Sequence, residues 1–329
     1  MSTNRPQFAT KFTGDLPYYV PFPENVAFEP SRSETDPYHL IIQHFHPLRH
    51  PDDSSGTGVD DRIGTYLRSR VIIEFTKLTG LDPIIMSKAL SITNSLVEAI
   101  RYYTSDYHLR PILNFDHTLV ERIGEEGECI IKEHAGFGPF GLEPQRFLDR
   151  RSIRPIWELF NGIMPMNPAR MLILDAKYHA SLEDFNRAIL DLGTALEIHI
   201  GWLMNYYEPV APLLEDINIE DTDIWRLYND ILQEATGHSL QENQNLYIEL
   251  EYIRNIRNSI THEWKAVFRI TKHFRSNFIS EHQKRDGTLI RSKCQIHELI
   301  DNTQKILDYT DALFQTKYHH STGGIKIIG

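Results

Sequence analysis

The sequence has few cysteines and no long apolar run. Its two cysteines, Cys129 and Cys294, lie far apart in a chain of 329 residues, and no CxxC pair occurs. They support neither a disulfide framework nor a cysteine zinc site. No apolar run is long enough to cross a bilayer, and the first twenty residues lack the hydrophobic stretch of a signal peptide. We therefore expect a cytoplasmic protein without membrane contact.

Positive charge is scarce overall, but it is unevenly distributed. The chain has 34 Lys and Arg residues against 45 Asp and Glu residues, a formal net charge of −11. This balance argues against a protein that coats nucleic acid nonspecifically, because such binding needs many cations on phosphates. Residues 253–293 are different, since they hold ten Lys or Arg residues and three acidic ones. This basic stretch predicts one focused site for an anionic ligand or, more simply, a solvated charged surface.

The N-terminal half combines extended segments with one amphipathic helix. Eight of the seventeen prolines fall within the first 51 residues, so long helices cannot form there. The pair Asp82-Pro83 starts a helix whose apolar residues recur at spacings of three and four. We expect an α+β domain over residues 1–150. Its strands are predicted where β-branched and aromatic residues concentrate, at 38–46, 69–78, 112–120 and 128–134.

A segment rich in glycine and proline, HAGFGPFGLEP at residues 134–144, ends the strand-like region. It lacks the GxxxxGK[ST] pattern of a phosphate-binding loop, and Pro139 removes an amide donor that such a loop needs. Beyond residue 165 the apolar period becomes helical, which predicts an all-α bundle of about five helices over residues 151–329. Asn167-Pro168 opens the first helix, and Ser181 with Asp184 resembles a capping box for the second. The others are expected at 221–235, 242–264 and 294–314.

The helix expected at 242–264 carries polar residues on its apolar face near its end: Arg254, Arg257, Asn258 and His262. Asn258 and His262 are four apart and share a face, and Arg257 projects next to Asn258. Arginine grips phosphate oxygens through two hydrogen bonds, and histidine titrates near neutral pH. Together they could bind and cleave a phosphodiester, with about 10²–10⁴-fold from a positioned histidine. Alternatively, the cations only cap the helix C-terminus, where the helix dipole favours them.

The segment IRNIRNSITHEW contains the pattern R-N-x-x-x-H at Arg257, Asn258 and His262. It resembles the signature of the HEPN superfamily (higher eukaryotes and prokaryotes nucleotide-binding domain). The context is similar as well, because the motif ends the penultimate long helix and one more helix follows. Upstream, FNRAILDLGTALEIHIGWLM is similar to a helix of many bacterial members. The resemblance covers about residues 165–318, and the N-terminal half resembles no family.

This resemblance implies a HEPN-like helical bundle that forms a homodimer and joins two copies of the motif in one cleft. Many such proteins are metal-independent endoribonucleases of toxin–antitoxin, phage-defence or RNA-processing systems, and they need no cofactor. Carried over, Arg257 stabilises the phosphate, His262 moves or orients a proton and Asn258 fixes the geometry. Glu197 is a weaker candidate for orienting Arg257, and Arg254 is a supporting residue. Other members are non-catalytic, which leaves a nucleotide-, RNA- or protein-binding module as the alternative, with the N-terminal domain as a possible contact for a protein partner.

Two further sets of residues have simpler interpretations. His44, His46, His50 and Asp52 could form a metal site, but their flanking prolines favour a polar loop. The tryptophans are expected to anchor the hydrophobic core. One of them, Trp157, lies near the domain boundary, and Trp202, Trp225 and Trp264 lie in the predicted bundle.

Overall fold

A computed structural model gives the structure of residues 9–16, 20, 26–28, 37–45, 68–76, 82–115, 117–123, 129–135, 148, 150–207, 222–270 and 279–319. The chain divides into two compact units, Met1–Pro165 and Met166–Gly329. The division falls after the helix α2 (Ile153–Phe160), whereas the sequence placed it near residue 150. No helix among the described residues is long and apolar enough to cross a membrane.

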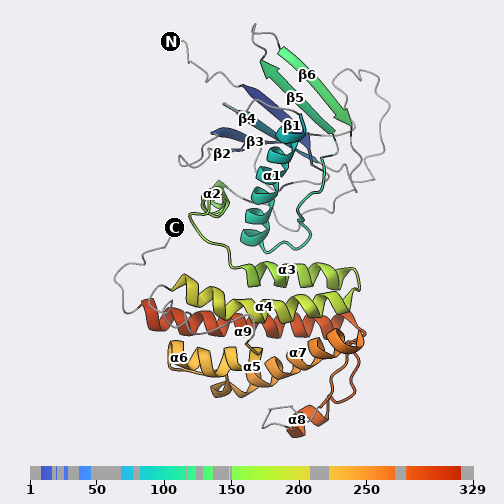
Figure 1. The fold of residues 1–329 in the computed structure, drawn as a ribbon, viewed down its shortest axis with the longest axis vertical. Coiled ribbons are helices and arrows are strands. Elements are labelled where there is room, and N and C mark those ends of the chain that lie inside the picture. The colour runs from blue at the N-terminus through green and yellow to red at the C-terminus, as the bar shows by residue number, and fades with distance from the viewer. Residues whose placement is uncertain are drawn as a thin grey trace. The chain divides into compact units, whose positions relative to one another are not determined.

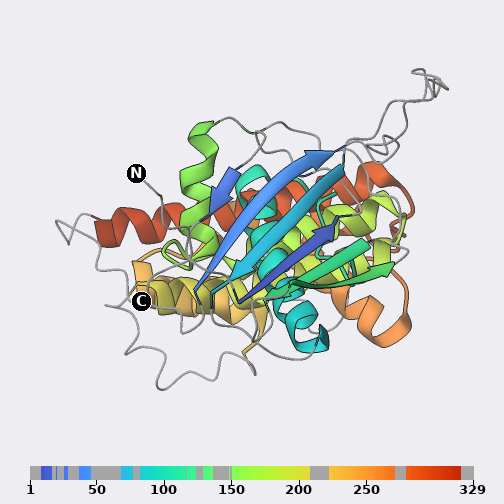
Figure 2. The ribbon, with the colours of Figure 1, turned by 90° about the horizontal axis from the view of Figure 1, so that it is seen from above.

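The first unit contains an antiparallel sheet and the long helix α1 (Asp82–Thr104), which lies against one face of it (Figures 1 and 2). The strand order is β2-β3-β4-β1-β5-β6. Alternate residues such as Phe12, Leu40 and Ile73 are buried, because successive side chains of a strand point to opposite faces. The strands are β1 (Thr10–Asp15), β2 (Val26–Phe28), β3 (Tyr38–Phe45), β4 (Arg68–Phe75), β5 (His117–Ile123) and β6 (Cys129–Ala135).

The sheet corrects two expectations about the strands. β1 and β2 were not predicted, although β1 pairs with both β4 and β5. The strand expected from residue 112 begins only at His117. The reason is a contact with another element: the side chain of Asn94 on α1 donates to the carbonyl of Ile112 (2.9 Å) and accepts from its amide (2.8 Å). Both backbone groups of Ile112 are therefore engaged and cannot join a strand ladder.

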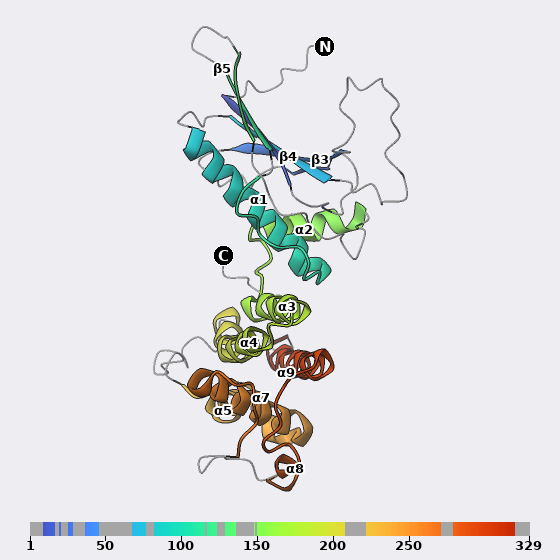
Figure 3. The same cartoon turned by 90° about the vertical axis from the view of Figure 1, so that its right-hand side faces the viewer.

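The second unit is a helical bundle, as expected, with no β-strand among its described residues (Figure 3). Its long helices are α3 (Pro168–Ser181), α4 (Phe185–Tyr206), α7 (Gln244–Glu263) and α9 (Lys293–His319). Seen nearly end-on in Figure 3, α4 and α9 lie side by side between α3 and α7, and each of them contacts both. The core between these helices is apolar and includes Leu196, Ile200, Ile253 and Leu307, all inaccessible to solvent.

The helix ends show one correct and one wrong sequence prediction. Asn167 caps α3 by accepting the amide of Ala169 (2.9 Å), and Pro168 occupies the first turn, as predicted. The capping box expected at Ser181 does not form. Ser181 ends α3 and donates to the carbonyl of Tyr178, while Asp184 caps α4 by accepting the amide of Arg187 (3.1 Å). The turn between the helices thus uses residues that the sequence assigned to the second helix.

The described part of this unit contains seven α-helices rather than about five. The helix expected at 221–235 is a continuous element with a π-helical turn in its middle. It consists of α5 (Ile224–Arg226), the π-helical η4 (Leu227–Ile231) and α6 (Leu232–Thr236). A short helix, α8 (Ile279–Gln283), was not predicted. The π turn cannot be seen in an apolar period that assumes 3.6 residues per turn.

A buried polar cluster joins α3, α4 and α9 at the centre of this bundle. His199 on α4 is inaccessible to solvent, and its Nδ1 lies 3.1 Å from the Asn167 amide nitrogen. Its Nε2 lies 3.0 Å from the Thr310 hydroxyl and 3.2 Å from a carboxylate oxygen of Asp311. Asp311 also accepts from Arg170 at 2.5 Å. Burial opposes ionisation of Asp311, but the hydrogen bonds from His199 and Arg170 outweigh it and lower its pKa.

Candidate functional site

The motif residues lie in the last turns of α7. This helix is capped at Asn243, whose side chain accepts the amide of Leu246 (3.3 Å). It buries one apolar face, and it ends at Trp264. Arg257 and Asn258 are partly buried, whereas His262 is exposed one turn later. The helix therefore anchors the motif on a rigid element and leaves the histidine in contact with solvent.

A glycine on α4 makes room for Arg257. A Cβ atom built on Gly193 would lie 2.7 Å from Cγ of Arg257 and 3.4 Å from its Cβ and Cδ. Glycine in the middle of a helix costs about 1 kcal/mol relative to alanine. The close approach accounts for its presence, because the aliphatic part of Arg257 lies where any other side chain would project. α4 and α7 thus form a seam at this point.

Glu197, one turn beyond Gly193, receives the guanidinium of Arg257. Nη2 of Arg257 lies 2.7 Å from one carboxylate oxygen of Glu197 and 3.0 Å from the other. The two side chains are 29% and 31% exposed, so the pair lies at the surface of the seam. Neither Nε nor Nη1 of Arg257 binds another described residue. Glu197 therefore fixes the guanidinium and leaves donors for a ligand oxygen.

Asn258 and His262 make no side-chain hydrogen bond or ion pair with any other residue that the structure describes. They share one face of α7 because they are four apart. An unpaired amide and an unpaired imidazole on the helix that carries the fixed guanidinium can serve a phosphodiester, one by binding it and the other by moving a proton.

Arg254 is placed differently from the other motif residues. It binds the carboxylate of Asp223 through Nε at 2.8 Å and Nη2 at 2.5 Å, and its Nη1 lies 3.9 Å from the buried Glu251. Asp223 is also the N-cap of α5 and accepts the amide of Trp225 (3.0 Å). Arg254 thus fastens the start of α5 to α7. The supporting role expected from the sequence is in this structure a structural one.

The basic stretch is largely neutralised by carboxylates, most of which come from other parts of the chain. Lys272 and Arg275 lie outside the described residues. Five of the cations that the structure describes bind a carboxylate, and only Glu263 belongs to the stretch itself. The pairs are Arg254 with Asp223, Arg257 with Glu197, Arg269 with Glu263, Arg285 with Glu249 and Lys293 with Glu183. The positive charge of the sequence therefore does not become one strongly basic surface.

One tryptophan that was expected in the core lies at the surface, close to the motif in the sequence. Trp264 is 75% exposed, whereas the sequence predicted that it anchors the core. It follows His262 by two residues and ends α7 in the left-handed conformation, with φ 55° and ψ 27°. The apolar period of α7 could not reveal this, because Trp264 lies where the helix ends and the period no longer applies.

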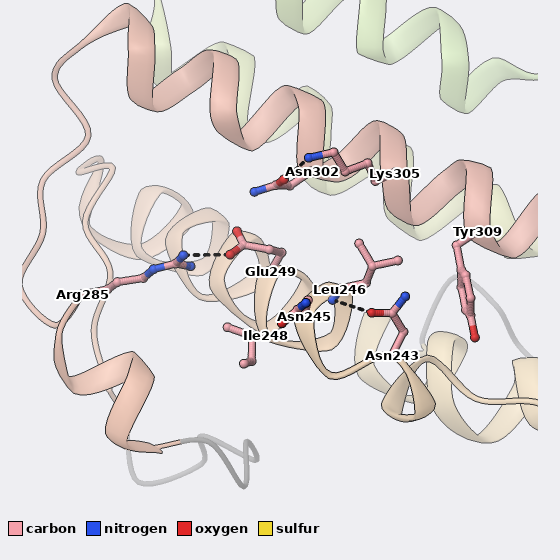
Figure 4. Close-up of a pocket in the computed structure, with 9 residues that line it drawn as sticks. All are labelled: Asn243, Asn245, Leu246, Ile248, Glu249, Arg285, Asn302, Lys305 and Tyr309. Atoms are coloured by element: carbon pink, nitrogen blue, oxygen red, sulfur yellow. Dashed lines mark hydrogen bonds and ion pairs between the residues drawn. The ribbon is translucent and has the colours of Figure 1, made fainter.

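A hollow lies at the other end of α7 from the motif, between this helix, α9 and Arg285 (Figure 4). Its volume is about 740 Å³. Arg285 stacks on the ring of Tyr252 (4.4 Å) and binds Glu249 at 2.8 Å. Burial opposes the charge of Arg285, but Glu249 outweighs this effect and raises the arginine pKa. The remaining lining is mostly polar: Asn243, Asn245, Leu246, Ile248, Asn302, Lys305 and Tyr309. The sequence did not predict this pocket.

Metal ligands are not gathered in the described part of the chain, where no group of three or more His, Cys, Asp or Glu side chains could hold an ion. The histidine cluster at residues 44–52 lies outside the side chains that the structure describes.

No family model, curated protein or solved structure matches the chain. The HEPN resemblance therefore rests on the motif and its helical context.

Proposed function

We propose that the helical unit is a metal-independent endoribonuclease that cleaves RNA phosphodiesters at Arg257, Asn258 and His262. One observation carries this proposal. Arg257 is held by Glu197 through a single nitrogen, with Nε and Nη1 unengaged, and the unpaired His262 follows one turn later on the same helix. The guanidinium of Arg257 thus keeps unengaged donors, and the exposed imidazole of His262 lies five residues later on the same helix.

The chemistry requires only groups that this chain supplies. The RNA 2′-hydroxyl attacks the adjacent phosphorus, and neutral His262 accepts the hydroxyl proton. Arg257 stabilises the charge that builds on the phosphate oxygens, and Asn258 orients the phosphate. The bond from phosphorus to the 5′-oxygen then breaks, and this oxygen takes a proton. The products are a 2′,3′-cyclic phosphate and a 5′-hydroxyl.

We further propose a symmetric homodimer, as the HEPN resemblance implies. One copy of the motif has a single histidine, whereas the reaction needs a proton acceptor and a proton donor. Two copies in one cleft supply both, and a twofold interface is the commonest oligomer geometry. Sedimentation at micromolar concentration tests this part, and a monomer would contradict it.

In the same proposal the protein acts in phage defence or as a toxin–antitoxin component in the cytoplasm, and the first unit contacts a protein partner.

The decisive experiment incubates labelled total RNA with the protein in EDTA. We expect cleavage by the wild type, with cyclic phosphate ends, and none by His262→Ala. His297→Ala is the matched control, because His297 is another exposed histidine without a described partner and lies on α9. Cleavage by His262→Ala, or inhibition of the wild type by EDTA, would contradict the proposal.

The pocket of Figure 4 favours a second candidate, a non-catalytic module that binds a nucleotide or another small anion. Its volume lies within the usual range for small-molecule sites, about 300–1,000 Å³. Lys305 supplies positive charge, whereas the charge of Arg285 is paired with Glu249, and Asn302 and Asn245 offer amide groups. Calorimetry with nucleoside monophosphates and inorganic phosphate tests it. Binding that Lys305→Gln weakens, together with no RNA cleavage, would favour this candidate over the ribonuclease.

A further inference from the structure

Trp264 combines two features that the fold alone does not explain. It is a large apolar side chain with 75% of its surface exposed, and its backbone is left-handed. Residues other than glycine rarely adopt positive φ, and for a bulky side chain this conformation is strained. Glycine or asparagine would end α7 at lower cost. A tryptophan at this position costs conformational energy and leaves most of its surface exposed to solvent.

The exposure of Trp264 does not come from a loose loop. Its amide donates to the carbonyl of Ile260 at 2.8 Å, and its carbonyl accepts from the Asn186 side chain of α4 at 3.3 Å. The chain after it returns to α7, where Asn255 accepts the amide of Arg269 (2.6 Å) and also donates to the carbonyl of that residue. The ring is therefore presented to solvent from a backbone that is fixed on both sides.

The backbone of Trp264 lies on the same helix seam as Arg257. Asn186 of α4 holds the backbone of Trp264, and farther along α4 Gly193 and Glu197 receive Arg257. Seven residues of helix separate Arg257 from Trp264, which is about 10 Å along the axis. His262 lies between them, two residues before the tryptophan.

We propose that Trp264 is a stacking platform for an unpaired nucleobase next to the scissile phosphate. This inference rests on the proposed function and narrows its substrate to single-stranded RNA. Aromatic side chains stack on bases of any sequence, because every base has a π-face. Bases within a duplex are already stacked on their neighbours and are not free to bind the ring. The exposed Lys265, next in the chain, adds positive charge for the adjacent backbone.

The test measures RNA binding in a His262→Ala background, so that the RNA stays intact. Trp264→Gly removes the ring and suits the left-handed backbone, and Trp264→Phe keeps a smaller ring. We expect Trp264→Gly to weaken binding of a single-stranded oligonucleotide by about 5- to 150-fold, the range for loss of one stacked base. Its melting temperature should not fall, because the substitution relieves backbone strain. Trp264→Phe should recover part of the affinity, and a fully paired duplex should bind Trp264→Gly and its parent equally.

An abasic scan of the oligonucleotide separates stacking from a structural role. One abasic position should weaken binding to the parent and have no further effect with Trp264→Gly, because the two changes remove the same contact. Losses that add at every position would overturn the inference. So would a dimer that Trp264→Gly converts to a monomer, which would assign the ring to a contact between copies. If the parent binds no RNA and the wild type cleaves none, the proposed function fails first; if cleavage is intact and Trp264→Gly is silent, only this inference fails.

Discussion

Two groups in the described part of the helical unit differ in how completely their polar atoms are paired. One is the buried group of His199, Asp311 and Arg170, and the other is the pair of Arg257 with Glu197, which lies on the helix that carries His262. At the buried group, His199 has a partner at each ring nitrogen, and Asp311 binds both His199 and Arg170. At the seam of α4 and α7, Glu197 binds only one nitrogen of Arg257. We call the first group closed, although Oδ1 of Asp311 makes no hydrogen bond, and the second open, because Arg257 keeps donors for a ligand.

Pairing in the buried group even fixes the proton on His199. The side-chain oxygen of Asn167 accepts the amide of Ala169, so its NH₂ faces Nδ1 of His199, which must accept. The proton is then on Nε2, where the Thr310 hydroxyl accepts it and a carboxylate oxygen of Asp311 lies 3.2 Å away. Nothing comparable constrains His262. A histidine whose tautomer is locked stabilises the fold, whereas an unconstrained one can exchange protons during a reaction.

The closed group also contributes more to the stability of the fold than the open group does. Polar groups buried without partners cost about 1–3 kcal/mol each, so the central group is stabilising only while it is complete. A half-exposed ion pair such as that of Arg257 with Glu197 contributes about 0–1 kcal/mol. The fold therefore depends on the first group and hardly on the second.

The largest effect should come from His262→Ala. We expect RNA cleavage to fall by about 10²–10⁴-fold, the contribution of a positioned acid–base group. Thermal unfolding should be unchanged, because the exposed imidazole has no partner among the described residues. Single-turnover cleavage and a melting curve on the same preparation check both parts. A melting temperature lowered by 10 °C would show that His262 stabilises the fold, and it would contradict the distinction between a structural closed group and a catalytic open group.

The converse should hold for His199→Ala. This substitution leaves the Asn167 amide and a carboxylate oxygen of Asp311 without their partner and opens a cavity in the bundle. We expect a loss of about 3 kcal/mol in the free energy of unfolding. For a unit of this size the melting temperature should fall by about 6–12 °C. Chemical denaturation measures the loss, and a fully stable His199→Ala would contradict the structural role of the group.

How far the sequence could predict the fold depends on the range of each interaction. The helices α3 and α9 follow from a repeated apolar spacing and from Asn167-Pro168, which act within a few residues. The strand start at Ile112 was wrong because Asn94, on another element, takes its backbone groups. The turn at Ser181 was wrong because two overlapping capping patterns compete and only packing decides between them.

The candidate site shows the same limit. Asn258 and His262 share a face because of their spacing alone, so this part could be predicted. The pairing of Glu197 with Arg257 joins residues on two helices, and only the family resemblance pointed to it. The exposure of Trp264 depends on where α7 ends and on how the chain returns, which no local pattern encodes. The ion pairs that neutralise the basic stretch involve carboxylates from distant segments, so the charge count was misleading.

A smaller effect is expected from Gly193→Ala, which tests the seam without touching a motif residue. The added Cβ would lie 2.7 Å from Cγ of Arg257, so the arginine must shift and its contact with Glu197 should be disturbed. We expect cleavage to fall about tenfold, which equals about 1.4 kcal/mol in the barrier. Stability should change little, because the better helix propensity of alanine, about 1 kcal/mol, offsets the clash.

The control for this substitution is Thr194→Ala on the neighbouring position of α4. The Thr194 hydroxyl donates only to the Leu190 carbonyl of its own helix, so its loss should leave cleavage intact. Kinetics with both variants decide the point. Equal activity of Gly193→Ala and wild type would show that the position of Arg257 does not limit the reaction. It would contradict the assignment of the open group as the RNA-cleavage site.

The smallest effect is a pH dependence that only the closed group should show. Burial works against ionisation of Asp311, but its bonds to His199 and Arg170 prevail, so its pKa in the folded state lies below the usual Asp value of about 3.9. A carboxyl whose pKa is lower in the folded than in the unfolded state binds fewer protons when folded. It therefore contributes stability above its unfolded pKa, and this contribution is lost as the pH falls below about 4 toward the folded pKa.

Urea unfolding between pH 3 and 6 should show this loss in the wild type and a flatter profile in Asp311→Asn, which cannot ionise. Glu197→Gln at the open group should keep the wild-type slope, because its half-exposed pair with Arg257 adds little to stability. An equal flattening by both substitutions would mean that the two groups do not differ in how they couple to folding.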